Sequence, residues 1–207
     1  MESALNDSCV WKLAIHPTDA RVMFAGTGTP NPARVFRSED AGGTWHELAM
    51  TVAKECPAVG VPRVTGIAID PLQTETVWVG LEVDGFRRSR NGGDSWEELS
   101  ETIPNRDVHA VVVTAGPPKS VFIVVNNDVY ISQDDGVSWT PIRAKQVFPW
   151  TYTRNIALHP TDPRTVFVSI GDATPGRTGA VMRSNDMGLT WRQLSLRELD
   201  ALFLRGR

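Results

Sequence analysis

The chain contains one eight-residue motif four times, and this repetition limits the folds open to it more than any other feature. The motif reads Ser-x-Asp/Asn-x-Gly-x-Ser/Thr-Trp and occupies residues 38–45, 89–96, 132–139 and 184–191. Five specified positions repeated four times do not arise by chance. Because the copies begin about 43 to 52 residues apart, each interval has the length of one structural repeat, and the chain is expected to fold as an array of similar units.

The segment before each motif predicts short strands. An apolar run ended by turn residues occurs at 12–17, 66–71, 110–115 and 155–160. These runs are rich in Val and Ile and too short for helices, so they predict strands that are buried on both faces. A second strand follows at 23–26, 77–80, 121–124 and 166–169, a third enters the motif, and a fourth leaves it through the tryptophan. Four strands in each interval are typical of a β-propeller blade.

The motif itself predicts the turn between the third and fourth strands. Its Asp or Asn side chain can accept hydrogen bonds from the backbone N–H groups of a tight turn. Its glycines supply a positive φ without steric cost, and they are Gly42, Gly93, Gly136 and Gly188. We expect the tryptophan to cover the hairpin and to pack toward the next blade. A catalytic or metal-binding role for the acids is the alternative, but a residue that recurs in every blade serves the blade rather than one asymmetric site.

These motifs resemble Asp-box, or bacterial neuraminidase (BNR), repeats. Such repeats occur in sialidases, sortilin-type receptors, xyloglucanase-type glycosidases and photosystem II assembly factors, and the chain is most similar to uncharacterised bacterial members of this superfamily. The resemblance covers about residues 9–195. It implies an all-β propeller of four-stranded antiparallel blades. Since the superfamily hosts enzymes, receptors and scaffolds alike, the resemblance predicts a fold and leaves the activity open.

The strand pattern also predicts how the chain is divided. We expect one propeller-type domain over residues 1–207, with blades near 9–48, 63–99, 107–142 and 153–194 and a C-terminal tail at 195–207. The tail reads as a short amphipathic helix or an unrelated extension, because no fifth innermost strand follows the last blade.

Four blades leave the closure of the propeller open. The alternatives are a closed four-bladed ring, an open half that pairs with another copy, and a truncated reading of a longer gene. Propellers of this superfamily usually close with six or more blades, so we favour an incomplete, open arc of a larger propeller. Its two apolar end blades would then promote self-association.

Topology assigns the loops to two faces of the propeller. The first-to-second connections and the Asp boxes share one face, and the opposite face carries the irregular loops at 27–34, 49–63, 100–107, 144–154 and 171–179. Loops that differ between repeats carry function more often than the scaffold does. At the start of the innermost strands, aligned positions form a polar and aromatic rim around the central channel: Trp11, Thr65, His109 and Arg154.

The irregular face supplies the candidate ligand-binding residues. These are Arg63, His109, Trp150, Tyr152, Arg154, Asp172 and Arg177. Aromatic faces and arginine forks suit a protein, peptide or carbohydrate ligand. The alternative is that these are solvated loop residues, with Trp150 capping a gap between blades.

Enzymatic interpretations find little support in the residues. The sialidase resemblance would require three arginines that clamp a carboxylate, a Tyr nucleophile with a Glu partner, and an Asp acid/base. The chain has two tyrosines, of which Tyr130 lies in a predicted strand, and it lacks the Arg-Ile-Pro segment. A xyloglucanase-type hydrolase would require two carboxylates that flank a cleft, whereas Glu82, Asp84 and Asp172 read as isolated, solvated acids. No catalytic residue is therefore assigned.

Metal, cofactor, nucleic-acid and membrane roles are not predicted. The four histidines include His16 and His159 at matching turn positions, and no zinc-ligand spacing is present. The net charge of −3 disfavours nucleic acid and anionic membranes as partners, and no apolar run is long enough to cross a bilayer. The N-terminus lacks the features of a signal peptide, which predicts a cytoplasmic location with Cys9 and Cys56 reduced.

Taken together, the residues favour a non-catalytic propeller that binds a ligand or protein, or assists assembly, through the face opposite the Asp boxes. A divergent glycoside hydrolase, sialidase- or xyloglucanase-like, is one alternative. A fragment that functions only within a larger assembly is another.

Overall fold

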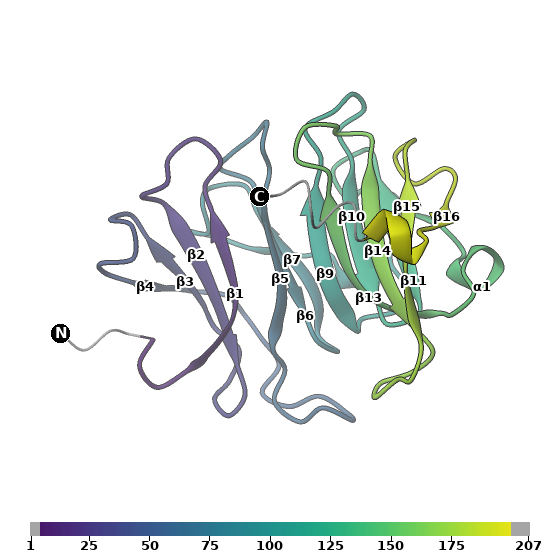
Figure 1. Cartoon of the computed structure of the whole chain (residues 1–207). Coiled ribbons are helices and arrows are strands. Elements are labelled where there is room, and N and C mark those ends of the chain that lie inside the picture. Colours follow the sequence, from purple (N-terminus) through teal and green to yellow (C-terminus); the bar gives the residue numbers. More distant parts are fainter. Residues whose placement is uncertain (1–4, 200–207) are drawn as a thin grey trace.

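A computed structural model describes residues 5–199 and folds them into four antiparallel sheets of four strands each (Figure 1). The first sheet contains β1 (Cys9–Ile15), β2 (Met23–Gly28), β3 (Val35–Ser38) and β4 (His46–Leu48). The second contains β5 (Val64–Ile69), β6 (Val77–Leu81), β7 (Gly85–Ser89) and β8 (Glu97–Glu98). The third contains β9 (Val108–Val113), β10 (Val121–Val125), β11 (Asp128–Ser132) and β12 (Thr140–Pro141). The fourth contains β13 (Tyr152–Leu158), β14 (Val166–Gly171), β15 (Gly179–Ser184) and β16 (Arg192–Gln193).

The sheets stand side by side as the blades of an open arc. Within each sheet the strands keep their chain order, and the first strands pack against one another in the sequence β1, β5, β9 and β13. Figure 1 shows the first blade in purple at one side and the fourth in green and yellow at the other. Between blades lie a single 3₁₀ turn, η1 (Ser100–Thr102), and a one-turn helix, α1 (Ala144–Val147). The predicted all-β fold of four-stranded propeller blades in an incomplete arc is therefore confirmed.

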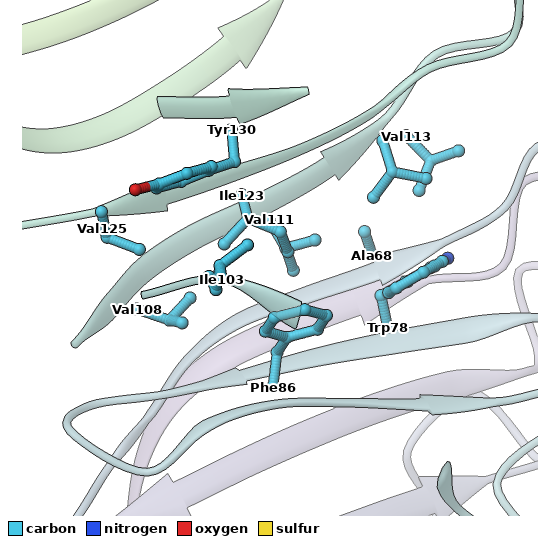
Figure 2. Packing of buried hydrophobic residues seen from close by; sticks show 11 residues of the cluster. Ala68, Trp78, Phe86, Ile103, Val108, Val111, Val113, Ile123, Val125 and Tyr130 are labelled. Atoms are coloured by element: carbon cyan, nitrogen blue, oxygen red, sulfur yellow. The ribbon is translucent and has the colours of Figure 1, made fainter. Parts of the chain in front are cut away.

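The hydrophobic core consists of three clusters, one between each pair of neighbouring blades. Figure 2 shows the middle cluster, in which Trp78 and Phe86 of the second blade face Val111 and Ile123 of the third. Each such side chain stabilises the fold by about 1.5–3 kcal/mol when it is fully buried. The apolar contacts that stabilise the fold therefore lie mainly between blades, so the stability of each blade depends on the blade next to it.

The innermost strands differ in burial according to their place in the arc. Strands β5 and β9 are largely buried, as predicted. Strand β1 is not, because Leu13 and Ile15 are each 59% exposed, and the prediction of burial on both faces is wrong for this strand. Strand β13 is also partly exposed. The cause is that β1 and β13 belong to the end blades, each of which packs on one neighbouring blade only.

The Asp boxes form the predicted turns between third and fourth strands. In the first box, Asp40 Oδ1 accepts from the backbone N–H of Thr44 at 2.8 Å, and Ser38 Oγ accepts from the N–H of Gly42 at 2.9 Å. Asn91, Asp134 and Asp186 accept the equivalent backbone bonds in the other boxes. The four box glycines have φ values between 82° and 97°, as expected. The preceding residue is also left-handed in every box, even though three of these residues, Ala41, Asp135 and Met187, are not glycine.

The box tryptophans pack in the direction opposite to the prediction. The ring of Trp139 in the third blade contacts Trp78 and Phe86 of the second, with centroids 6.3 and 5.4 Å apart. Trp96 likewise packs on the cluster between the first and second blades. The tryptophan thus contacts the preceding blade, because it lies on the same side of its sheet as the apolar residues that face backward along the arc. The indole N–H of Trp191 donates to the carbonyl oxygen of Gly188 at 2.9 Å, whereas the buried indole N–H groups of Trp96 and Trp139 have no acceptor within residues 5–199.

The described part of the predicted tail begins a helix. Residues 196–199 are helical, and Glu198 accepts a hydrogen bond from the N–H of Ser195 and pairs with Arg192 at 2.8 Å. The rest of the tail, residues 200–207, lies outside the described residues. The division into one domain with a separate tail stays a prediction.

Candidate functional site

The two faces of the arc carry the loops as the sequence predicts. Hydrogen bonds join each of three boxes to the first-to-second turn of its own blade, for example from Ala41 N–H to the Arg21 carbonyl at 2.9 Å. The equivalent bonds run from Gly92 to Glu75 and from Met187 to Arg164. On the opposite face, the β6–β7 loop meets the segment before β5, where Arg63 pairs with Glu82. The irregular loops therefore share the face that the Asp boxes leave free.

A cavity of about 130 Å³ opens on this face, at the inner ends of the four blades. Its lining comes from the beginnings of all four innermost strands and the adjoining loops, and comprises Trp11, Lys12, Arg63, Val64, Thr65, Glu82, His109, Arg154 and Asn155. The structure thus brings the four predicted rim residues together. The lining also contains three of the predicted ligand-binding residues, Arg63, His109 and Arg154.

A β-bulge at the same place in every innermost strand explains why the rim side chains point toward the cavity. In each blade, the pairing of the first strand with the second skips one residue of the first strand. The skip lies between Val10 and Lys12, between Val64 and Gly66, between Val108 and Ala110, and between Thr153 and Asn155. The extra residue in each case is the rim residue: Trp11, Thr65, His109 and Arg154. Bulges redirect a side chain out of the normal alternation and are frequent beside active sites. Here four of them direct residues toward one cavity.

Two rim side chains also tie neighbouring blades together. Thr65 Oγ1 donates to the carbonyl oxygen of Val108 at 2.5 Å. His109 Nδ1 lies 2.7 Å from the carbonyl oxygen of Thr153, and because a carbonyl only accepts, Nδ1 carries the proton. Both acceptors immediately precede the next rim residue. The rim is therefore held by side-chain bonds from β5 to β9 and from β9 to β13.

Arg63 is fixed from two sides at the cavity wall. Its guanidinium lies over the Trp11 ring, 4.7 Å from the centroid, which is a cation–π contact between the first and second blades. Its Nε donates to the carboxylate of Glu82, whose side chain is nearly buried. The one carboxylate in the cavity lining is therefore neutralised by an arginine.

His109 borders the cavity as a buried, oriented imidazole. Its side chain is 2% exposed, its ring centroid lies 5.3 Å from that of Tyr152, and its Nε2 is 3.6 Å from Asp107 Oδ1. Burial opposes ionisation of Asp107, but the nearby imidazole of His109, followed by polar groups of Asn126 and Val83, outweighs it and holds the pKa of Asp107 below its usual value. This arrangement places a negative carboxylate behind the ring and Tyr152 beside it.

Two cations in the cavity lack a partner of opposite charge. Within residues 5–199, neither Lys12 nor Arg154 forms an ion pair. Partial burial, and then the positive charge of Arg154, lower the pKa of Lys12. Two cations that repel each other at the mouth of a cavity are a site at which a bound anion would lower the electrostatic energy.

The other predicted ligand-binding residues lie outside the cavity lining. Trp150 packs against the cluster between the third and fourth blades, as in the structural alternative. Asp172 Oδ1 accepts from the backbone N–H groups of Arg177 at 2.9 Å and Thr178 at 3.3 Å, and these bonds lower its pKa. The side chain of Arg177 is exposed. Whether any of the seven residues binds a ligand stays a prediction.

Sequence reasoning missed some lining residues, Lys12 and Asn155 among them, and misjudged two acids. Lys12 was not expected at the site, although it directly follows a rim position. Glu82 and Asp84 were expected to be isolated and solvated, and this is wrong: both are buried. Glu82 pairs with Arg63, while Asp84 pairs with Arg87 at 3.3 Å and accepts from the N–H of Ala53. For Asp84, the arginine three residues later in β7 was the available signal.

Side chains that could ligate a metal are dispersed in the described part of the chain. There, no group of three His, Cys, Asp or Glu side chains lies close enough together to hold a metal ion. Cys9 and Cys56 are free thiols, and burial raises the pKa of Cys56. Among residues 5–199 no helix has the length and apolar character needed to cross a membrane.

Comparison with known proteins identifies the family. The Sortilin-Vps10 family model, described as "Sortilin, neurotensin receptor 3", matches residues 84–203, which is more than half of the chain. The chain belongs to the Sortilin-Vps10 family. This membership agrees with the predicted Asp-box propeller superfamily.

Individual relatives of this Sortilin-Vps10 chain include named enzymes. The probable oligoxyloglucan-reducing end-specific xyloglucanase of Neosartorya fischeri is 26% identical over 223 residues, which cover 89% of this chain and 27% of that protein. The xyloglucanase Xgh74A of Acetivibrio thermocellus is 23% identical over 190 residues, which cover 88% of this chain and 19% of that protein. The Sortilin-Vps10 chain thus spans about a quarter or less of the length of these relatives.

Solved structures show the same fold. The GH74 enzyme of Niastella koreensis superposes with a TM-score of 0.71 at 24% identity, covering 89% of this chain and 30% of that one. YCF48 bound to D1 peptide superposes with a TM-score of 0.51 at 14% identity, covering 90% of this chain and 82% of that one. At these identities the likeness concerns the fold alone.

Proposed function

We propose that this Sortilin-Vps10 chain is a non-catalytic binding module that recognises an anionic group of a peptide or carbohydrate in the cavity at the rim. The observation that carries the proposal is the convergence of four β-bulges on a cavity whose cations, Lys12 and Arg154, have no carboxylate partner within residues 5–199. The bulge recurs in every innermost strand as part of the blade, but the residue that it turns toward the cavity differs from blade to blade, as a specific site requires.

The chemistry of the lining suits such a ligand. The planar guanidinium of Arg154 can donate two parallel hydrogen bonds to a carboxylate, and the Lys12 ammonium adds a second charge nearby. The Trp11 ring, held by Arg63, offers an apolar surface to a sugar ring or an apolar side chain. The cavity thus combines two positive charges that would attract an anionic ligand with an aromatic ring that would orient it.

The named neighbours support both ligand classes. The relatives and structural neighbours include xyloglucanases, which act on a carbohydrate, and YCF48 bound to D1 peptide. Peptide and carbohydrate are therefore the two classes to test, with protein assembly as the broader role. The expected cytoplasmic location, and the expected lack of nucleic-acid and membrane partners, remain part of the proposal.

A divergent glycoside hydrolase is the second candidate, favoured by the xyloglucanase relatives. Hydrolysis requires a carboxylic acid that donates a proton and a second carboxylate that acts as base or nucleophile. The buried acids on this face, Glu82 and Asp84, are each engaged in an ion pair with an arginine, so neither is a free carboxyl group that faces a ligand. Because the chain spans only part of its relatives, a fragment that works within a larger assembly is a third candidate.

Calorimetric titration of the full chain tests the proposal. The probes are a short acidic peptide with a free carboxyl terminus, its amidated neutral counterpart, a xyloglucan oligosaccharide and an acidic oligosaccharide. We expect an acidic probe to bind, Arg154→Ala to weaken that binding about tenfold, and no probe to be hydrolysed. Arg164→Ala, an exposed arginine on the box face, is the matched control and should bind normally. Binding that is equally strong for neutral probes, or cleavage of an oligosaccharide, would contradict the proposal.

A further inference from the structure

At one position in the second strand, every blade has an aromatic side chain, which in the first three blades faces the following blade. The residues are Phe24, Trp78, Phe122 and Phe167, each flanked by the same type of strand sequence. The first three are essentially fully buried, within the clusters that join successive blades. Phe167 is only partly buried, and it lies on the open side of the fourth blade. An aromatic ring suited to an interface between blades is thus available at that end of the arc.

The box glycines of the second, third and fourth blades contact side chains of the preceding blade. A Cβ placed on Gly136 would lie 2.8 Å from the Trp78 ring, and one on Gly188 would lie 3.2 Å from the Phe122 ring. Gly93 meets Leu48 of the first blade in the same way. For Gly42, in the first box, the atoms nearest to such a Cβ belong to Trp45 and Met23 of its own blade. The first blade therefore keeps open the place where each other box receives its predecessor.

A hydrogen bond repeats at two of these three junctions, whereas the third blade has Ile131 at the donor position. Arg37 Nη1 donates to the carbonyl oxygen of Gly92 at 2.8 Å, and Arg88 Nη1 donates to the carbonyl oxygen of Asp135. Both acceptors are the fourth residue of the next blade's box. Arg183 holds the same position in the fourth blade as Arg37 and Arg88 do in theirs.

Arg183 is already arranged as its counterpart is in a formed junction. Its guanidinium lies 5.7 Å from the Phe167 ring centroid, and that of Arg88 lies 5.3 Å from the Trp78 ring centroid. Its Nε donates to Asn185, and within the described chain its two terminal nitrogens have no acceptor. The fourth blade thus has the aromatic ring and the arginine of a blade junction, but the described chain has no following Asp box for them to contact.

We propose that the fourth blade of one copy packs on the first blade of a second copy as though it were the preceding blade. Phe167 then covers Gly42 of the second copy, and Arg183 donates to the carbonyl oxygen of its Ala41. The exposed Leu13 and Ile15 become buried, as Val111 and Val113 are at the corresponding positions of the third blade. The contact joins two different surfaces, so it is head-to-tail rather than symmetric.

This inference does not rest on the proposed ligand, but it affects the same cavity. Trp11 and Lys12 belong to β1, the strand that the second copy would cover, and both line the cavity. The second copy would therefore add its own innermost strands to the channel and enclose the rim further.

Sedimentation equilibrium of the full chain tests the contact through complementation. Leu13→Glu blocks only the receiving surface and Phe167→Glu only the donating surface. We expect the unaltered chain to associate with increasing concentration and each variant alone to stay monomeric. An equimolar mixture of the two variants should form a 1:1 dimer, because each retains the surface that the other lacks. A monomeric unaltered chain, or a mixture that stays monomeric, would overturn the proposal, as would a Phe167→Glu variant that still associates by itself.

A milder pair of variants separates the contact from folding. Arg183→Ala removes the junction hydrogen bond without placing a charge in the interface, and it should weaken association about tenfold. Arg90→Ala removes an exposed arginine of the second box, away from both ends, and should leave association unchanged. Equal loss in both variants, or in neither, would count against the assigned contact.

Discussion

The imidazole of His109 lies with Nδ1 2.7 Å from the carbonyl oxygen of Thr153, and this bond joins the innermost strands of the third and fourth blades. The ring also borders the cavity, so one side chain both shapes the candidate site and links two blades. Thr65 makes the equivalent link from the second blade to Val108 of the third. Thr65 and His109 thus link neighbouring blades as well as lining the cavity.

Replacing His109 should therefore destabilise the fold. His109→Ala leaves the Thr153 carbonyl without its donor in a buried setting, which should lower the free energy of unfolding by about 1–3 kcal/mol. Urea unfolding measures the change. His109→Gln, which keeps a donor, should recover part of the loss, and equal losses in both variants would argue against the bond.

The left-handed box glycines should tolerate no side chain where a blade packs on them. Gly136→Ala places a Cβ against the Trp78 ring at φ 82°, and we expect a loss of about 2–4 kcal/mol from backbone strain and the clash together. Gly60→Ala is the control, since Gly60 has φ 68° but nothing within 4 Å of the added Cβ. It should lose only about 1 kcal/mol. Similar losses in chemical denaturation would contradict the packing contribution.

The acidic boxes should make stability depend on pH in the acid range. Hydrogen bonds from the backbone and hydroxyl of Thr44 lower the pKa of Asp40 to about 2, and bonds from Ser138 do the same for Asp134. Because the folded pKa is depressed below the unfolded value, the stabilisation is present above about pH 4 and is lost as the pH falls toward 2.

Asparagine provides the test, because Asn91 occupies the equivalent position of the second box. Thermal melts of an Asp40→Asn, Asp134→Asn double variant should show a flatter dependence between pH 4 and 2 than the unaltered chain. An unchanged slope would show that the box carboxylates do not cause the acid sensitivity.

The charge of Arg154 should be visible in the titration of Lys12. Burial, followed by the Arg154 charge, lowers the pKa of Lys12, so Arg154→Ala should raise it toward the normal value. Nuclear magnetic resonance of the lysine side chain follows the titration. Arg164→Ala, on the box face, should leave it unchanged, and a shift of the same size there would contradict the assignment.

The sequence predicts those parts of the molecule that repeat. The boxes, the four strands of each blade and the two loop faces follow from patterns present four times, and even the rim positions align between blades. The bulges themselves were not predictable, because one extra residue in a strand leaves no periodicity to detect. The exposure of Leu13 also escaped prediction, since its run is as apolar as that before Val113 and differs only in lacking a neighbouring blade.

Interactions between separate segments were equally out of reach. The pairing of Arg63 with Glu82 depends on two loops meeting across the second blade. The backward packing of Trp139 depends on which side of its sheet the outermost strand presents. Neither contact can be predicted from the residues adjacent to it in the sequence.

The claim that the bulged rim forms a binding site is tested most directly by the indole N–H signals of the tryptophans. Nuclear magnetic resonance titration with the tightest-binding acidic probe should move the signal of Trp11, at the cavity, and leave those of Trp96, Trp139 and Trp191, in the boxes, in place. Movement of the box signals with a stationary Trp11 would contradict the assignment of the site.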